Sequence, residues 1–136
     1  MSVFIMHSDH TKVQQAADKL RQALTDQGLR VDTVSPSTAS SSPISTAPYK
    51  LVCVISEFKG LWKPQIPAEM DSLLRRATRL EGKRGVAFVI PGLGSSRALR
   101  VLMAHLESQG MMVEDFGTLG GVRQILATAE RLGRLV

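Results

Sequence analysis

Three short apolar runs in this chain are each followed by a turn-containing segment and then by a stretch with helical spacing of apolar residues. The turn-containing segments span residues 7–11, 56–62 and 91–96. Strand, turn and helix repeated in this order are typical of a parallel sheet covered by helices. In such a sheet the loops that leave the carboxyl ends of the strands meet along one edge, where ligands bind. The order of elements therefore predicts an α/β fold with a ligand site at that edge.

Five strands are expected from the apolar pattern. Residues 3–6, 51–55 and 86–90 are continuously apolar, which is typical of strands covered on both faces, and the second of these strands is expected to run to Ser56. Residues 29–34 alternate between apolar and polar, which predicts a strand at a sheet edge. Residues 111–116 follow a glycine and provide the last strand.

Four helices are expected between and after these strands. The clearest runs from Thr11 to Gln27, before Gly28, and a second covers Gln65–Arg79 with Pro67 in its first turn. A third starts at a capping Ser95 or Ser96 and stops at Gly110. The last begins at Val122 and is ended by Gly133. Thr11 is the expected N-cap of the first helix.

Residues 35–48 are the exception, because Ser, Thr, Pro and Ala dominate them and Ile44 is the only bulky apolar residue. No periodic face could be buried, so we expect a loop where a crossover helix would otherwise stand. The whole chain then predicts one domain, residues 1–136, built as a three-layer sandwich around a five-stranded parallel sheet.

Chain length, charge and cysteine content limit the possible partners and the cellular compartment but do not identify a function. The chain has 136 residues, enough for a core without disulfides, and 17 basic against 12 acidic residues give a net charge of +5. This balance favours anionic partners. The single cysteine, Cys53, lies in an apolar run and is expected to be a buried packing residue. No run is long enough to span a membrane and no signal peptide is recognised, so a soluble cytoplasmic protein is expected.

Residues 51–116 carry a more specific pattern. A strand ending in Val54-Ile55-Ser56 precedes a loop with Gly60, Trp62 and Pro64, then a helix, a second buried strand, and a turn with Gly92 and Gly94. This pattern resembles the flavodoxin-like family, and in particular its flavin and quinone reductases. The resemblance covers nearly the whole chain. It implies strand order 2-1-3-4-5 and flavin mononucleotide (FMN) over the carboxyl ends of strands one, three and four.

The resemblance also implies a set of cofactor-binding residues. The first loop would bind the FMN phosphate through Ser8, His10, Thr11 and Lys12. The second loop would lie on the isoalloxazine ring face through Glu57, Phe58, Gly60 and Trp62. The third loop would approach the ring edge through Pro91, Gly92, Gly94 and Ser95. Here Ser8-Asp9-His10-Thr11 stands where the family has a longer, glycine-containing phosphate loop, and Asp9 brings a negative charge.

Other kinds of site have less support in the sequence. His7, His10 and Asp9 have no further ligand at metal-binding spacing, so no metal site is predicted. The sequence shows neither a nucleophile paired with a base nor a pair of loop carboxylates, which are the patterns that would indicate catalysis without a cofactor. Aromatic residues make up 4% of the chain, which argues against a nucleic-acid stacking platform.

Two functions remain open on the sequence alone. The first is an FMN-binding electron-transfer protein or small NAD(P)H-dependent flavin or quinone reductase, with a small-molecule or protein redox partner, as a monomer or homodimer. The second is a binding or regulatory module that has lost FMN and uses its basic surface for a nucleotide, nucleic acid or protein. As an oxidoreductase, the protein would leave the chemistry to its cofactor.

Overall fold

A five-stranded parallel sheet forms the centre of the computed structural model, which describes residues 2–136. The strands are β1 (Ser2–His7), β2 (Arg30–Val34), β4 (Leu51–Ser56), β6 (Arg84–Val89) and β7 (Met112–Thr118). Their order is β2-β1-β4-β6-β7, and all neighbouring pairs are parallel. This is the predicted order 2-1-3-4-5, with the alternating strand β2 at an edge.

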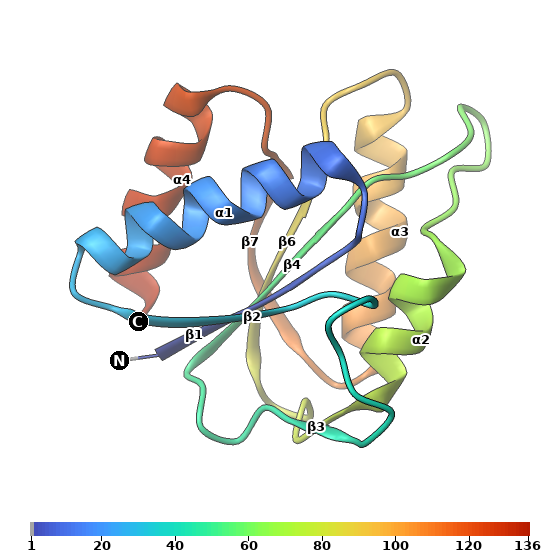
Figure 1. Cartoon of the computed structure of the whole chain (residues 1–136). Helices are drawn as coiled ribbons and strands as arrows, with labels where there is room; N and C mark the ends of the chain where they lie inside the picture. The colour runs from blue at the N-terminus through green and yellow to red at the C-terminus, as the bar shows by residue number, and fades with distance from the viewer. Residues whose placement is uncertain (1) are drawn as a thin grey trace.

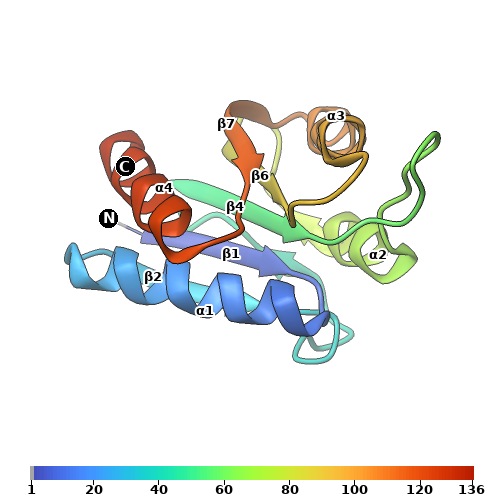
Figure 2. The same cartoon turned by 90° about the horizontal axis from the view of Figure 1, so that it is seen from above.

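Helices cover both faces of this sheet. α1 (Thr11–Asp26) and α4 (Val122–Leu135) lie on one face, and α2 (Ala68–Arg76) and α3 (Ser95–Ser108) lie on the other (Figure 2). Side chains alternate along each strand, so Ile5, Cys53 and Phe88 pack under α1 and α4, while Val54 and Ala87 pack under α2 and α3. The predicted three-layer sandwich is confirmed.

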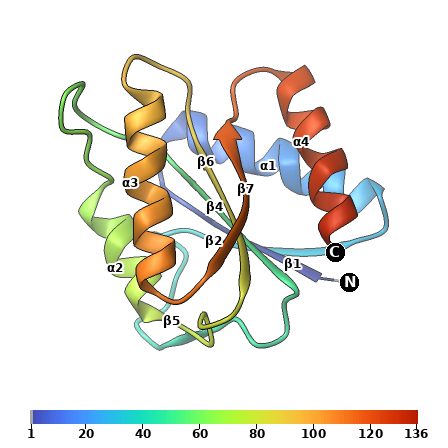
Figure 3. The ribbon, with the colours of Figure 1, turned by 180° about the vertical axis from the view of Figure 1, so that it is seen from behind.

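The second helix is shorter than predicted at both ends. The sequence predicted Gln65–Arg79, but α2 spans Ala68–Arg76 because Pro67, with an extended ψ of 141°, provides its N-cap. At the other end, β5 (Ala77–Thr78) leaves the helix and pairs in parallel with β3 (Ile44–Ser45). This two-stranded sheet lies at the edge opposite the predicted ligand site (Figures 1 and 3). It anchors the 35–48 segment, which contains no helix, as predicted.

Gly133 does not end the last helix, contrary to the prediction. α4 continues to Leu135. A Cβ on Gly133 would overlap Oε1 of Gln27, and Gln27 Nε2 donates a hydrogen bond of 3.0 Å to the carbonyl of Ala129. The glycine therefore allows the end of α1 to approach α4 closely.

Candidate functional site

The predicted site lies where the carboxyl ends of the strands meet. The loops that follow β1, β4, β6 and β7 run along the same edge of the molecule, at the top of Figures 1 and 3. Because β4 lies between β1 and β6, the three loops with candidate residues are consecutive along this edge. The topology therefore brings the three predicted segments to one end of the sheet.

Ser8 begins the first loop and is 1% exposed. Its amide donates to the carbonyl of Ile55 at 3.2 Å, which joins the loop to the end of β4. Among residues 2–136, no atom makes a hydrogen bond with the Ser8 Oγ atom. A buried hydroxyl without a partner is costly, so an acceptor or donor from a ligand would satisfy a group that the protein itself does not.

The N-cap of α1 is His10, not Thr11 as predicted. His10 has extended backbone angles, and its Nδ1 accepts a hydrogen bond of 3.2 Å from the Lys12 amide. The ring nitrogen thus does what a Ser or Thr oxygen usually does at this position. Thr11 is the first helical residue and is exposed, as are His10 and Lys12. The exposed Thr11 hydroxyl and Lys12 ammonium lie at the positive end of the helix dipole.

Asp9, the acidic residue of this loop, is directed to a neighbouring turn. Its Oδ1 accepts hydrogen bonds from Ser37 Oγ at 2.6 Å and from the Ser37 amide at 3.4 Å. Partial burial raises the pKa of the Asp9 carboxyl, but hydrogen bonds from Ser37 and Ser35 outweigh burial and leave its pKa below the ordinary value. The carboxylate is therefore held ionised by the turn after β2.

The second loop is closed by an antiparallel bridge between Lys59 and Gln65, whose backbone groups exchange hydrogen bonds of 3.0 and 2.8 Å. Trp62 lies at the tip of this loop and is 76% exposed. The guanidinium carbon of Arg97, on α3, lies 5.3 Å from the centre of the Trp62 ring, a cation–π arrangement. The indole is thus presented to solvent on one side and supported by a cation.

The third loop ends at Gly94, which is the N-cap of α3. Gly94 has φ +85°, and no side chain caps the helix, so the prediction of a capping Ser95 or Ser96 is wrong. A Cβ on Gly94 would lie 3.3 Å from the carbonyl oxygens of Gly60 and Leu61. Glycine at this position therefore gives both the left-handed turn and room for the second loop.

The second and third loops touch each other and enclose a shallow cavity. Phe58 packs beside Gly92, where a Cβ would lie 3.7 Å from the ring atom Cζ. The cavity has a volume of about 430 Å³. It is lined by Leu61, Trp62, Gly92, Leu93, Gly94, Ser95, Ser96 and Arg97. Of the predicted residues, Trp62, Gly92, Gly94 and Ser95 line it, whereas Glu57, Phe58, Gly60 and Pro91 do not.

Several residues of this edge were not predicted. Arg97 and the apolar pair Leu61 and Leu93, which are 45% and 84% exposed, contribute to the cavity. The Ser35–Thr38 turn contacts the first loop through Ser37. The spacing Ser35-x-x-Thr38 was a signal for such a turn, because the Thr38 hydroxyl accepts from the Ser35 amide at 2.9 Å. The exposed leucines carried no signal distinguishable from ordinary loop residues.

Two further kinds of feature are absent from residues 2–136. Within this range no three His, Cys, Asp or Glu side chains are grouped so that they could hold a metal ion. No helix in the same range is long and apolar enough to cross a membrane.

Comparisons with known proteins rest on structure alone. No protein-family model matches this sequence, and no curated protein matches it. Among solved structures, a flavodoxin from Streptococcus pneumoniae TIGR4 has a TM-score of 0.75 with 18% identity, and Flavodoxin 2 from Bacillus cereus has 0.76 with 13%; both alignments cover 100% of each chain. Two-electron reduced flavodoxin from Megasphaera elsdenii has 0.68 with 16%, covering 94% of this chain and 98% of its own. The chain therefore has a flavodoxin-like fold.

Proposed function

We propose that this protein binds FMN at the carboxyl edge of its sheet and transfers electrons. The observation that carries the proposal is the meeting of three loops at adjacent strand ends, one with an unpartnered buried hydroxyl and one with an exposed indole. Flavodoxins of similar structure are described in oxidised and two-electron reduced states, which supports a redox role for this arrangement.

The phosphate of FMN would lie at the start of α1. Ser8 Oγ and the Thr11 hydroxyl offer hydrogen bonds, Lys12 offers a positive charge, and His10 orders the first turn. The helix N-terminus adds amide groups that favour an anion. Asp9 does not oppose this placement, because its carboxylate is engaged by Ser37 on the side of β2.

The isoalloxazine ring would lie between the second and third loops. Trp62 offers a flat surface for stacking, and the backbone of Gly92–Ser95 can approach the ring edge closely because Gly92 and Gly94 have no side chains. Glu57, Phe58, Gly60 and Pro91 would hold the two loops in place. Binding requires the loops to separate from the contact in which Gly94 meets Gly60 and Leu61.

Bound FMN would supply one- and two-electron redox chemistry, while these residues bind it, orient it and exclude water. We further propose that a small-molecule or protein partner, or NAD(P)H as donor, approaches over the exposed side chains of Leu61, Trp62 and Leu93. In a homodimer, a second copy of the chain would cover the same apolar cluster. Sedimentation with and without FMN would show whether this dimer forms and whether it requires the flavin.

The test is a titration with FMN, followed by flavin and Trp62 fluorescence. Ser8→Ala and Ser35→Ala form a matched pair, because both hydroxyls are buried but only Ser35 has hydrogen-bond partners, at Ser37 and Thr38. Ser8→Ala is expected to weaken FMN binding roughly tenfold without loss of stability in the FMN-free protein. Ser35→Ala is expected to lower stability and to leave the affinity nearly unchanged.

Trp62→Ala tests the ring position in the same titration. Loss of stacking is expected to weaken FMN binding roughly tenfold, and Trp62→Phe is expected to restore most of the affinity. Leu93→Ala is the control, because it removes an exposed apolar side chain of the same cavity without removing an aromatic surface. A flat titration of the unmodified protein would refute flavin binding outright.

A flavin-free binding module is the second candidate. It is favoured by the short first loop without glycine, the Lys12 amide already taken by His10, and the direct contact between the second and third loops. Under this reading the basic surface would bind a nucleotide, a nucleic acid or a protein. A flat FMN titration combined with salt-sensitive binding of one of these partners would support it.

A further inference from the structure

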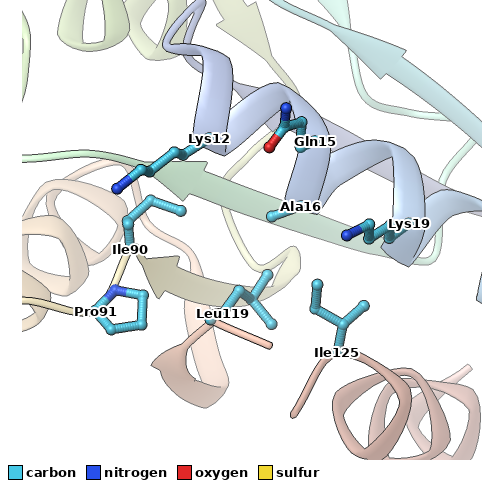
Figure 4. A pocket seen from close by; sticks show the side chains of 9 residues that line it. Lys12, Gln15, Ala16, Lys19, Ile90, Pro91, Leu119 and Ile125 are labelled. Carbon is cyan, nitrogen blue, oxygen red and sulfur yellow. The ribbon is translucent and has the colours of Figure 1, made fainter. Parts of the chain in front are cut away.

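A crevice lies between α1 and the start of α4, on the face of the sheet covered by these two helices. Its volume is about 360 Å³, within the range of small-ligand pockets. Figure 4 shows the residues that surround it: Lys12, Gln15, Ala16, Lys19, Ile90, Pro91, Leu119 and Ile125. Gly120 completes the lining. None of the second-loop residues belongs to this set, so the crevice is separate from the space between the second and third loops.

The polar wall comes from a single face of α1. Lys12, Gln15 and Lys19 follow a spacing of three and four residues, which places them on one side of the helix. Seven residues of helix separate the two lysines by about 10 Å along the axis, and their flexible side chains allow both ammonium groups to approach one ligand. In Figure 4 the Lys12 side chain lies beside Ile90, and the Lys19 side chain lies at the other end of the crevice, on the side of Ile125.

The opposite wall and the floor are apolar. Ala16, Ile90, Leu119 and Ile125 contribute aliphatic side chains. Leu119 and Ile125 are 1% and 2% exposed, so the apolar surface open to a ligand comes mainly from the half-buried Ile90 and the exposed Pro91. No acidic residue lines the crevice, and within residues 2–136 neither Lys12 nor Lys19 takes part in an ion pair. Two cations therefore border a crevice with an aliphatic floor, without a compensating charge from the lining residues.

The walls of the crevice are held by contacts at both ends. At the far end of the helix pair, Gln27 donates to the Ala129 carbonyl and holds α1 against α4. At the near end, Gln124 accepts from the Gly120 amide at 2.6 Å and donates to Thr118 Oγ1 at 2.9 Å, which fixes the loop between β7 and α4. A Cβ on Gly120 would lie 2.8 Å from Pro91, so the loop packs directly on the third loop.

We propose that this crevice binds a small organic anion with an apolar body, such as an aryl or alkyl carboxylate or sulfonate. The apolar body would lie on Ile90 and Pro91, above the nearly buried Leu119 and Ile125, the acidic group would meet the two lysines, and Gln15 would add a hydrogen bond. An apolar cavity with a few polar groups at its rim is the usual form of a small-molecule site. The proposal does not depend on FMN binding, although Lys12 borders both sites.

The experiment uses 8-anilinonaphthalene-1-sulfonate as probe and the full chain as protein. We expect saturable binding at one site, observed by fluorescence, and shifts of the methyl resonances of Ile90, Leu119 and Ile125 in NMR spectra with the same dissociation constant. Lys19→Ala is expected to weaken binding roughly fivefold, because it removes one of two charges that meet the anion. Arg123→Ala is the control, since it removes an exposed positive charge from α4 outside the crevice.

Four results would each overturn the proposal, and the fourth is displacement of the probe by inorganic phosphate. One is an equal loss of affinity in Lys19→Ala and Arg123→Ala, which would indicate a general effect of net charge. Another is shifts confined to Leu61 and Leu93, which would put the probe in the loop cavity. The third is equal affinity for the uncharged analogue N-phenyl-1-naphthylamine. Inorganic phosphate at matched ionic strength is expected not to displace the probe; displacement would mean a simple anion site with no role for the apolar floor.

Probe fluorescence and methyl shifts are measured in the absence of FMN. A negative result would therefore contradict the crevice proposal alone and would leave the FMN proposal unaffected. The ratio of the probe affinities of Lys19→Ala and the unmodified protein is expected to be the same with and without saturating FMN.

Discussion

Asp9 Oδ1 accepts a 2.6 Å hydrogen bond from Ser37 Oγ, and this contact joins the loop after β1 to the turn after β2. The turn is itself closed by a 2.9 Å bond from the Ala39 amide to the Ser35 carbonyl. The first turn of the Ser/Thr-rich segment, residues 35–39, therefore packs against the first loop. The Asp9 carboxylate holds this turn in place through Ser37.

Asp9→Asn is expected to remove a component of acid sensitivity. The folded pKa of Asp9 lies below its ordinary value of 3.8, so its contribution to stability is present above that value and is lost as the pH falls through the lowered pKa. The free energy of unfolding of the variant should therefore decline less than that of the unmodified protein as the pH falls below about 4. Urea unfolding at a series of acidic pH values measures this, with the exposed Asp18→Asn as control. An equal decline in the unmodified protein and Asp9→Asn would contradict the assignment.

Tyr49 offers a direct titration because it is the only tyrosine. Burial, and secondly the 2.7 Å hydrogen bond from its hydroxyl to Asp32 Oδ2, raise the pKa of Tyr49 to about 12. Since the folded pKa is the higher one, stability is complete below pH 10 and is lost as the pH rises toward 12. Tyrosinate absorbance should titrate near 12 in the folded protein and near 10.0 in urea. Asp32→Asn should lower the folded midpoint only part of the way, since burial remains.

Cys53 is expected to be unreactive until the protein unfolds. The thiol is fully buried in β4, and burial, with a smaller effect of Asp115, raises its pKa far above the ordinary value. Labelling by a thiol reagent should therefore follow the rate of unfolding rather than the concentration of reagent once the reagent is in excess. Rapid labelling under native conditions, proportional to reagent concentration, would show that β4 is accessible.

Gly133→Ala tests the close approach of α1 and α4. Alanine favours a helix by roughly 1 kcal/mol over glycine, but its Cβ would displace Gln27 and break the bond to Ala129, at a cost of about 1 kcal/mol. We expect little net change in the unfolding free energy. In a Gln27→Ala background the same substitution should stabilise by roughly 0.5–1 kcal/mol, because nothing remains to displace. Additive effects of the two substitutions would contradict the contact.

The layers, and the central or edge position of most strands, were predictable because they depend on local patterns, whereas the full strand order 2-1-3-4-5 came from the resemblance to the flavodoxin-like family. Continuous apolar runs at β1, β4 and β6, and alternation at β2, identify central and edge strands without any long-range information. The position of the three loops follows from the same reasoning, since parallel strands end at one edge. Trp62 and Gly94 could therefore be assigned to that edge from sequence.

The details that failed depend on contacts between distant residues. The end of α2 was misplaced because Ala77–Thr78 pairs with Ile44–Ser45, a partner that helical periodicity does not reveal. Gly133 was predicted to end the last helix because its contact with Gln27, more than one hundred residues earlier in the chain, cannot be recognised from local sequence. At His10, a ring nitrogen took the capping role that residue preferences assign to Thr11.

The same limit applied to the candidate site. Its aromatic and glycine residues were identified, but the Arg97 guanidinium over Trp62 and the Ser37 hydroxyl on Asp9 join segments 35 and 28 residues apart. Such pairs depend on side-chain directions that become defined only once the sheet has been formed. The crevice between α1 and α4 was likewise invisible, because its lysines resemble an ordinary solvated helix face.

The coil that stands in place of a crossover helix has a consequence for how the molecule opens. Val34, Ala39, Ile44 and Tyr49 pack over one side of the sheet, and the Tyr49 ring stacks on Phe4 with centroids 4.6 Å apart. Without helical hydrogen bonds this cover has little cooperativity of its own, whereas β4 and β6 are enclosed by helices and neighbouring strands. Amide protons of β2 should therefore exchange with solvent through partial opening, while those of β4 and β6 exchange only when the whole chain unfolds. We therefore expect two thermodynamic regions, with β2 and the 35–48 segment in the less stable one.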